Sequence, residues 1–153
     1  MAVPVLRQPK LKQEKSKVVM DIPNVIITLK DKTRLVVSSD AYHGILMASN
    51  MYKCVFCTTD MDLDMVYKEQ HKNTNTHKEN LKNYPHIDGY DENLVRKLNK
   101  DMWYCTICQI TVATSCLSRH INTSSHCEEL RKAIVKATAY HKIHSTHLVE
   151  VPT

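Results

Sequence analysis

The chain has 153 residues, of which 42% are hydrophobic and 24% are charged, with one Phe and one Trp. This length allows one ordinary domain or two or three very small ones, and units with so few large apolar side chains usually need a metal or disulfides. No apolar run approaches the roughly 18 residues of a membrane span, so we expect no membrane protein.

The six cysteines are expected to bind metal or stay reduced. The first residues lead into lysines instead of an apolar stretch, so no secretory signal is expected. In an intracellular chain, cysteines are more often metal ligands or thiols than disulfides. Disulfides would also leave the nine histidines unexplained.

The net charge of +5 is concentrated near the start of the chain. Residues 1–20 hold five Lys and Arg against one Glu, which leaves +1 for the rest. This segment also lacks periodicity and contains two prolines. We therefore expect a disordered basic arm, followed by nearly neutral domains.

Two β-branched runs follow the arm. Val25–Leu29 and Arg34–Val37 are separated by four polar residues, a pattern that predicts a β-hairpin. Ser39 or Asp40 is placed to cap a short helix that extends through Met47. A hairpin alone is marginally stable, so we expect it to pack on another element, such as the first part of the repeat described next.

The rest of the chain contains an internal repeat. Met51–Cys57 aligns with Met102–Cys108, and His71–Lys82 aligns with His120–Arg131. The two offsets differ by two residues, which a loop between the Cys pair and the His pair can absorb.

Helical segments are expected on either side of the second copy. Asn93–Leu98, in the linker between the copies, resembles one or two helical turns. After the second copy, a charged, helix-favouring stretch extends to about residue 143, and Leu130, Ala133, Ile134 and Ala137 share one face of it. Such a face usually packs in a core, but in so small a unit it could also bind a partner.

Each copy carries the ligands of a tetrahedral metal site. Two Cys separated by two residues place both thiolates on one turn, and two His on a following helix complete the set around Zn²⁺. Thirteen and eleven residues separate the Cys pair from the His pair, and five separate the two His. We predict two Zn²⁺ ions, with these ligands: Cys54, Cys57, His71 and His77; Cys105, Cys108, His120 and His126.

The wide His spacing predicts a break in each helix. Positions six apart lie roughly 240° apart around a regular helix, so two such imidazoles cannot meet one metal. Asn73–Thr74 and Asn122–Thr123 lie between the histidines, and both residue types favour breaks.

Apolar side chains are expected around each site. Tyr52 and Trp103 precede the first Cys of each copy by two residues and are expected to cover one side of the metal. Leu117, three residues before His120, is expected in the core. Its counterpart Lys68 is not apolar, so Val66 or Tyr67 is expected to replace it.

The Cys-x-x-Cys pattern, followed by 11 to 13 residues and by two His with five residues between them, resembles the matrin-type zinc finger, also found in a spliceosomal protein of the small nuclear ribonucleoproteins. The resemblance covers about 51–83 and 102–135. It implies small ββα units with extended, kinked helices, mostly in nuclear proteins. Many members bind RNA, often double-stranded, and others act through protein contacts.

The sequence thus predicts a zinc-stabilised α+β protein with two ββα zinc fingers that have kinked helices. We divide it as follows: disordered basic arm 1–20, β-hairpin and short helix 21–49, first finger 50–83, linker 84–101, second finger with a C-terminal helix 102–145, tail 146–153.

The leading function is non-catalytic binding of structured or double-stranded RNA in the nucleus, with the cytoplasm as a second location. Candidate contacts flank the His pairs: Lys72, Lys78, Lys82, Arg119, Arg131 and Lys132. They could touch phosphates and 2′-hydroxyls by shape. Against this, Asp60, Asp62 and Asp64 in the first finger would repel phosphate. A protein adaptor in a chromatin, transcription or RNA-processing complex therefore stays open.

Two further functions are weighed and disfavoured. Sequence-specific DNA reading would use residues ahead of the first His, of which only Arg119 and Gln70 are good base readers. A nucleotide deaminase would pair His77 and Glu79 with Cys105 and Cys108, but the repeat explains these residues without catalysis, and four protein ligands leave no open position.

Some Cys and His residues lie outside the ligand pattern. Cys116 and Cys127 are expected as buried or free thiols. The series His141, His144 and His147 is expected at a surface helix end and not at a third metal site.

Overall fold

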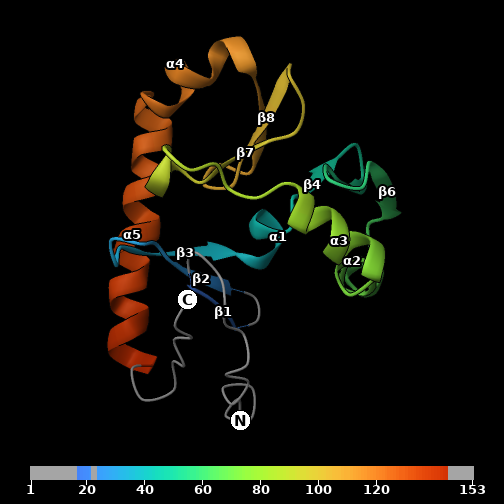
Figure 1. The fold of residues 1–153 in the computed structure, drawn as a ribbon. Coiled ribbons are helices and arrows are strands. Elements are labelled where there is room, and N and C mark those ends of the chain that lie inside the picture. The colour runs from blue at the N-terminus through green and yellow to red at the C-terminus, as the bar shows by residue number, and fades with distance from the viewer. Residues whose placement is uncertain (1–16, 22–23, 145–153) are drawn as a thin grey trace.

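The computed structural model of the chain describes residues 17–21 and 24–144. These residues form three antiparallel sheets of three strands each, and a long helix runs along one side (Figure 1). The first sheet and the helix after it comprise β1 (Lys17–Asp21), β2 (Asn24–Thr28), β3 (Arg34–Ser38) and α1 (Ser39–Tyr42).

Two similar units follow. The first unit, residues 45–83, comprises β4 (Ile45–Ala48), β5 (Met51–Cys54), β6 (Thr59–Asp62), α2 (Met65–Lys72) and α3 (Asn75–Asn83). The second unit, residues 95–144, follows the 3-10 turn η2 (Asp91–Asn93) and comprises β7 (Val95–Lys97), β8 (Met102–Cys105), β9 (Ile110–Ala113), η3 (Thr114–Cys116), α4 (Leu117–Ile121) and α5 (Ser124–His144). No helix among the described residues has the length and hydrophobicity of a membrane span.

The predicted hairpin is present as β2 and β3, but β1 extends it to a sheet. Residues 1–16 lie outside the described residues, whereas Lys17–Asp21, predicted in part as disordered arm, pairs with β2. The sheet packs on α5 of the second unit, and not on the first unit as expected. Sequence periodicity alone could not reveal which element would cover the hairpin.

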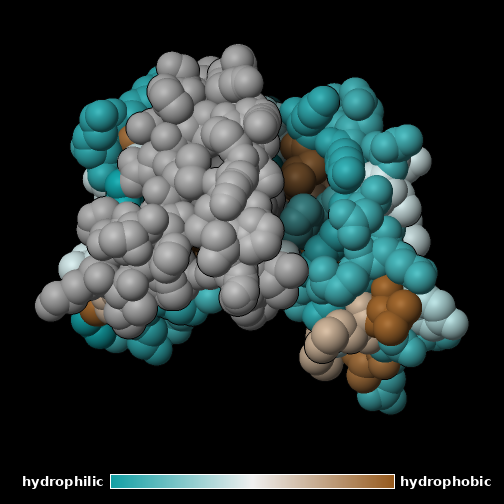
Figure 2. All heavy atoms as spheres, turned by 90° about the horizontal axis from the view of Figure 1, so that it is seen from below, coloured by the Kyte–Doolittle hydropathy of each residue, from teal (hydrophilic) through white to brown (hydrophobic). Residues whose placement is uncertain are grey.

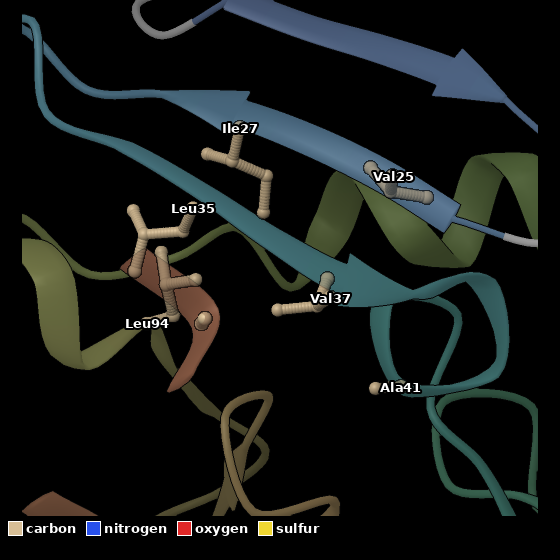
Figure 3. Packing of buried hydrophobic residues seen from close by; sticks show 7 residues of the cluster. Val25, Ile27, Leu35, Val37, Ala41 and Leu94 are labelled. Carbon is tan, nitrogen blue, oxygen red and sulfur yellow. The ribbon is translucent and has the colours of Figure 1, made fainter. Parts of the chain in front are cut away.

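Both faces of this sheet contribute to the core. Val25 pairs with Val37 and Ile27 pairs with Leu35, so all four side chains share one face, and Figure 3 shows them on the side where Leu94 lies. Ala133 of α5 completes this cluster.

The predicted apolar face of α5 is therefore buried against the sheet. Leu130 and Ile134 pack beside Ala133, and Ala137 contacts Ile26 and Val36 on the other face. Packing against the sheet therefore accounts for this face.

One expected helix is shorter than predicted, and another expected helical segment contains a strand. The helix capped near Ser39 ends at Tyr42, because Gly44 adopts a left-handed conformation (φ 69°) and the next residues form β4. A Cβ on Gly44 would also lie 2.5 Å from the ring of Phe56. The cap is Ser38, one residue before the expected one.

The linker segment expected to be helical contains β7 instead. Val95 pairs with Cys105 and is fully buried, which stabilises a strand where local propensity favoured a helix. Each unit therefore has a third strand before the expected two, and its helix is divided in two where the break between the histidines was predicted.

The two units share a core. Tyr104 of β8 is fully buried, packs edge-on against Phe56 of the first unit, and donates from Oη to the carbonyl of Ala41 at 2.6 Å. Gln109 donates from Nε2 to the carbonyl of Ile45 at 2.7 Å. These contacts fix the second metal-binding turn against the strand that opens the first unit.

Candidate metal centres

The structure brings together both predicted ligand sets. In each set, the four ligand atoms lie within 4.8 Å of one another: Cys54, Cys57, His71 and His77 in the first, Cys105, Cys108, His120 and His126 in the second. In each set, one Cys and the second His are fully buried, and the other two residues are partly buried. No other His, Cys, Asp or Glu cluster of this kind is found in the described part of the chain.

The spacing of the ligand atoms fits one tetrahedral ion per set. His77 Nδ1 lies 3.5 Å from Cys54 Sγ and 3.6 Å from Cys57 Sγ. His126 Nδ1 lies 3.5 and 3.4 Å from the two sulfurs of its own set. A tetrahedral ion with metal–sulfur and metal–nitrogen distances of about 2.3 and 2.0 Å separates S from N by roughly 3.5 Å. The side chains are thus spaced for an ion at the centre.

The first histidine of each set has a buried nitrogen without a partner. The Nε2 atoms of His71 and His120 are buried and have no hydrogen-bond partner among the residues that the structure describes. An unpaired buried polar atom is costly, so this position calls for a partner. A metal ion bound at Nε2 would supply one in both units.

The second histidine of each set faces the sulfurs through Nδ1 and is fixed from behind through Nε2. His77 Nε2 lies 2.9 Å from Nδ1 of His43, and His126 Nε2 lies 2.8 Å from Oδ1 of Asn93. Such outer partners set the tautomer and orientation of a metal-binding imidazole. Neither His43 nor Asn93 was predicted as part of a site, because both lie outside the repeat and carry no pattern that would reveal them.

The helix in each unit is broken between its histidines, as predicted. Helix α2 ends at Lys72 and α3 begins at Asn75, while α4 ends at Ile121 and α5 begins at Ser124. The break lets both rings reach the same centre.

The Asn-Thr pair satisfies the backbone groups that the break exposes. Thr74 Oγ1 donates to the carbonyl of His71 at 2.8 Å and accepts from the N–H of His77 at 3.1 Å. Thr123 makes the same two bonds, at 2.7 and 3.1 Å, to the histidines of the second set. The hydroxyl therefore links the two ligand-bearing residues directly and stabilises the geometry that the metal requires.

His77, Cys54 and Cys108 are held in their neutral forms without a metal. Burial, and then the neighbouring His71, lowers the pKa of His77 to about 4. Burial raises the pKa of Cys54 to about 12, and the hydrogen bond with Cys105, followed by burial, raises that of Cys108 to about 12. A neutral imidazole is ready to bind metal, whereas a buried thiol needs a nearby cation to ionise.

The side chains around the sites differ between the units. Leu117 is buried with Trp103, as predicted. In the first unit, Val66 and Tyr67 are exposed, so the prediction that one of them replaces Leu117 is wrong. Lys68 itself occupies this position, because its stem can be buried while its ammonium lies 4.6 Å from the centre of the Tyr52 ring.

Lys72, one of the six proposed nucleic-acid contacts, serves inside the fold. Its side chain is only 6% exposed, and its Nζ lies 2.7 Å from a carboxylate oxygen of Asp40 and 3.0 Å from one of Glu69. Lys68 binds the other oxygen of Asp40 at 2.9 Å. The ion pairs tie α2 to α1, and Lys72 is not placed to meet a phosphate.

The other five proposed contacts are exposed. Arg131 and Lys132 pair with acids one turn earlier on α5, at 2.6 and 3.5 Å, and such exposed pairs contribute only about 0–1 kcal/mol. For Lys78, Lys82 and Arg119, no ion pair is found within the described residues. Figure 1 places α3 and α4, which carry them, in separate parts of the molecule, so the set does not form one surface.

The bounds of the units reveal a charge difference that the sequence analysis missed. The first unit holds five Lys and Arg against five acids, and the second holds eight against three, a net +5. Acidic residues of the intervening linker hide this difference in the total. The exposed side chains of Lys97 and Lys100 add to the positive charge of Arg119. The hydroxyl of Thr114 donates to the carbonyl of Lys100 at 2.8 Å, which joins the turn that carries Lys100 to the segment that leads into α4.

The deaminase arrangement is not formed. His77 lies with Cys54 and Cys57, while Cys105 and Cys108 belong to the other set. Each set of four ligands is therefore complete within its own unit.

The remaining Cys and His residues lie outside the two sets. Cys116 is partly buried beside the core of the second unit, and Cys127 is exposed. The side chains of His141 and His144, and all of His147, lie outside what the structure describes.

Comparisons with known proteins do not add to these observations. No protein-family model matches the chain, and neither the curated proteins nor the solved structures contain a significant match. The two Cys₂His₂ sets therefore rest on their own geometry: two centres, each able to hold one metal ion.

Proposed function

We propose that this chain is a zinc-finger protein that acts by non-catalytic binding, with two structural Zn²⁺ ions and with structured or double-stranded RNA as its ligand. The observation that carries the proposal is the pair of Cys₂His₂ sets at tetrahedral spacing. Two thiolates and two imidazoles in this geometry favour Zn²⁺ over the hard cations that prefer oxygen.

Four protein ligands at each centre support a structural role for zinc. A catalytic zinc keeps one position for water or substrate, whereas a structural zinc is enclosed by the protein. Metal binding then contributes directly to the free energy of folding, because the unfolded chain has no preformed site.

The basic second unit is the surface that we assign to RNA. Lys97, Lys100 and Arg119 are exposed there, and Ser118, which carries a hydroxyl, is exposed next to Arg119 in the chain. Cations and hydroxyls of this kind contact phosphates and 2′-hydroxyls without reading bases. The resemblance to matrin-type fingers favours the same ligand and a nuclear location.

A titration of the zinc-loaded full chain with duplex RNA, duplex DNA and single strands tests this assignment. The triple variant Lys97→Ala, Lys100→Ala, Arg119→Ala is expected to weaken duplex RNA binding and to lower the salt slope by about one for each lost phosphate contact. The matched control replaces three exposed lysines elsewhere, Lys30, Lys32 and Lys53, and removes the same charge. Equal effects of the two variants would show that binding reflects only the total charge, and the assignment would fail.

The second candidate is the protein adaptor, and one observation favours it. The first unit is neutral and exposes several large apolar side chains, which suit a protein partner better than a nucleic acid.

A further inference from the structure

Exposed apolar side chains gather where β6 of the first unit leads into α2. Leu63, Met65, Val66 and Tyr67 are 47%, 66%, 58% and 50% exposed. Of the eight large apolar side chains that are exposed in the described part of the chain, six belong to the first unit. Figure 2 shows brown and tan side chains gathered at lower right, on the side where Figure 1 places this unit. Single exposed apolar residues are ordinary, but a cluster in one small unit is not.

The internal repeat offers a comparison for two of these positions. Counted back from the first histidine of each unit, Met65 and Val66 correspond to Thr114 and Ser115. All four are exposed. At these two positions the second unit has the 3-10 turn η3 with polar side chains, and in the first unit Met65 and Val66 open α2 with their side chains exposed, so burial in the core does not account for their apolar character.

Carboxylates flank this cluster along the chain. Asp60 and Asp62 are exposed on β6, and Asp64 caps α2 by accepting from the N–H of Val66 at 2.8 Å. Lys53, directly across from Asp60 on β5, is the one lysine paired in register with this strand, so the rim stays net negative. This rim would repel the phosphates of RNA and attract lysine or arginine side chains.

We propose that the surface formed by Leu63, Met65, Val66 and Tyr67, with the carboxylates of Asp60 and Asp62, binds a basic amphipathic segment of a partner protein. Apolar side chains of the partner cover the cluster, and its lysines or arginines face the carboxylates. Methionine suits such a surface, since its flexible thioether adapts to differently shaped apolar partners. This goes beyond RNA binding and uses the other unit, so the chain can hold an RNA and a protein at the same time.

The test uses the zinc-loaded full chain and two labelled synthetic helical peptides of equal length, with leucines at the same positions and either lysines or glutamates between them. Fluorescence anisotropy at physiological salt measures their affinity. We expect the lysine peptide to bind and the glutamate peptide to bind at least about tenfold more weakly.

Two variants with a built-in control locate the binding. Met65→Thr with Val66→Ser introduces the residues of the second unit and is expected to weaken binding of the lysine peptide at least about tenfold. Val135→Ser makes the same change at a valine that is 53% exposed, on α5, and is expected to have no effect. Asp60→Asn with Asp62→Asn is expected to weaken binding of the lysine peptide and not that of the glutamate peptide. Circular dichroism and zinc content verify that each variant is folded.

Three outcomes would overturn the proposal. The first is that the two peptides bind equally well. The second is that Met65→Thr with Val66→Ser weakens peptide binding no more than Val135→Ser does. The third is that Met65→Thr with Val66→Ser weakens duplex RNA binding and leaves peptide binding unaffected, which would assign the surface to RNA. Loss of RNA binding in the second-unit variants leaves the peptide result unchanged, so the two proposals fail independently.

Discussion

The contact between Asn93 and His126 gives the sharpest test of how the second metal centre is held. His126 is fully buried and faces the sulfurs through Nδ1, so its Nε2 carries the proton and donates to Oδ1 of Asn93 at 2.8 Å. Asn93→Ala removes this acceptor and leaves a buried N–H unpaired. Loss of an outer partner of this kind lowers metal affinity about 10- to 100-fold, or roughly 1.4–2.7 kcal/mol. The cost of an unsatisfied buried polar group, about 1–3 kcal/mol, agrees with this range.

Native mass spectrometry during titration with a zinc chelator measures the effect, because it counts chains with two, one or no ions. In the wild type, we expect both ions to leave over a similar range of chelator. In Asn93→Ala, one ion should leave at about 10- to 100-fold lower chelator activity while the other is unchanged.

The variant Asn93→Asp separates two roles of this side chain. Asn93 also donates from Nδ2 to the carbonyl of Tyr90 at 3.1 Å. Aspartate keeps the acceptor for His126 but cannot make the second bond, so we expect near wild-type zinc affinity. If Asn93→Ala retains wild-type affinity, or if Asn93→Asp loses as much as Asn93→Ala, then the bond to His126 does not hold the centre.

Three further predictions concern stability, each measured by chemical denaturation of the zinc-loaded chain. Asp40→Asn leaves two buried lysines without their shared carboxylate and should cost roughly 2–3 kcal/mol, less than a fully buried pair because Asp40 is 30% exposed; an unchanged midpoint would contradict this. Thr123→Ala removes the hydroxyl that accepts from the N–H of His126 and should cost about 1 kcal/mol, whereas Thr123→Ser should cost much less. Burial, and then the charge of Arg96, holds the pKa of His86 well below 6.5, so the fold needs it neutral. Since the unfolded chain binds this proton, the free energy of unfolding should fall as the pH drops below about 6.5. His86→Gln should make this fall shallower, and equal slopes in the variant and the wild type would refute the prediction.

The sequence predicted the metal centres because their ligands are set by local spacing and repeated twice. The pair of cysteines in each copy lies on one turn, and the histidine spacing required a break that the Asn-Thr pairs provide. These are short-range features, and the structure confirms each of them. The long C-terminal helix was predictable for the same reason, since its apolar face repeats along one continuous segment.

The errors concern residues whose state depends on distant partners. Val95 and its neighbours form a strand because β8 is available for pairing, and local propensity could not show this. Lys72 resembled a phosphate contact in the sequence, yet Asp40, 32 positions earlier, draws it into the fold. The same holds for the core position of the first unit, where Val66 or Tyr67 was expected and Lys68, which binds Asp40, is buried instead.

By itself, the sequence determined which eight side chains can bind metal, where each helix must break, and that the chain contains two copies of one unit. Only the tertiary structure decided how the copies differ: one neutral with an apolar surface, the other basic with its long helix covered by the first sheet. The physical reason is range. Ligand geometry and helix breaks follow from torsions within a few residues, whereas burial, ion pairing and strand pairing depend on which distant segments meet, as Tyr104 meets Ala41 across the two halves of the chain.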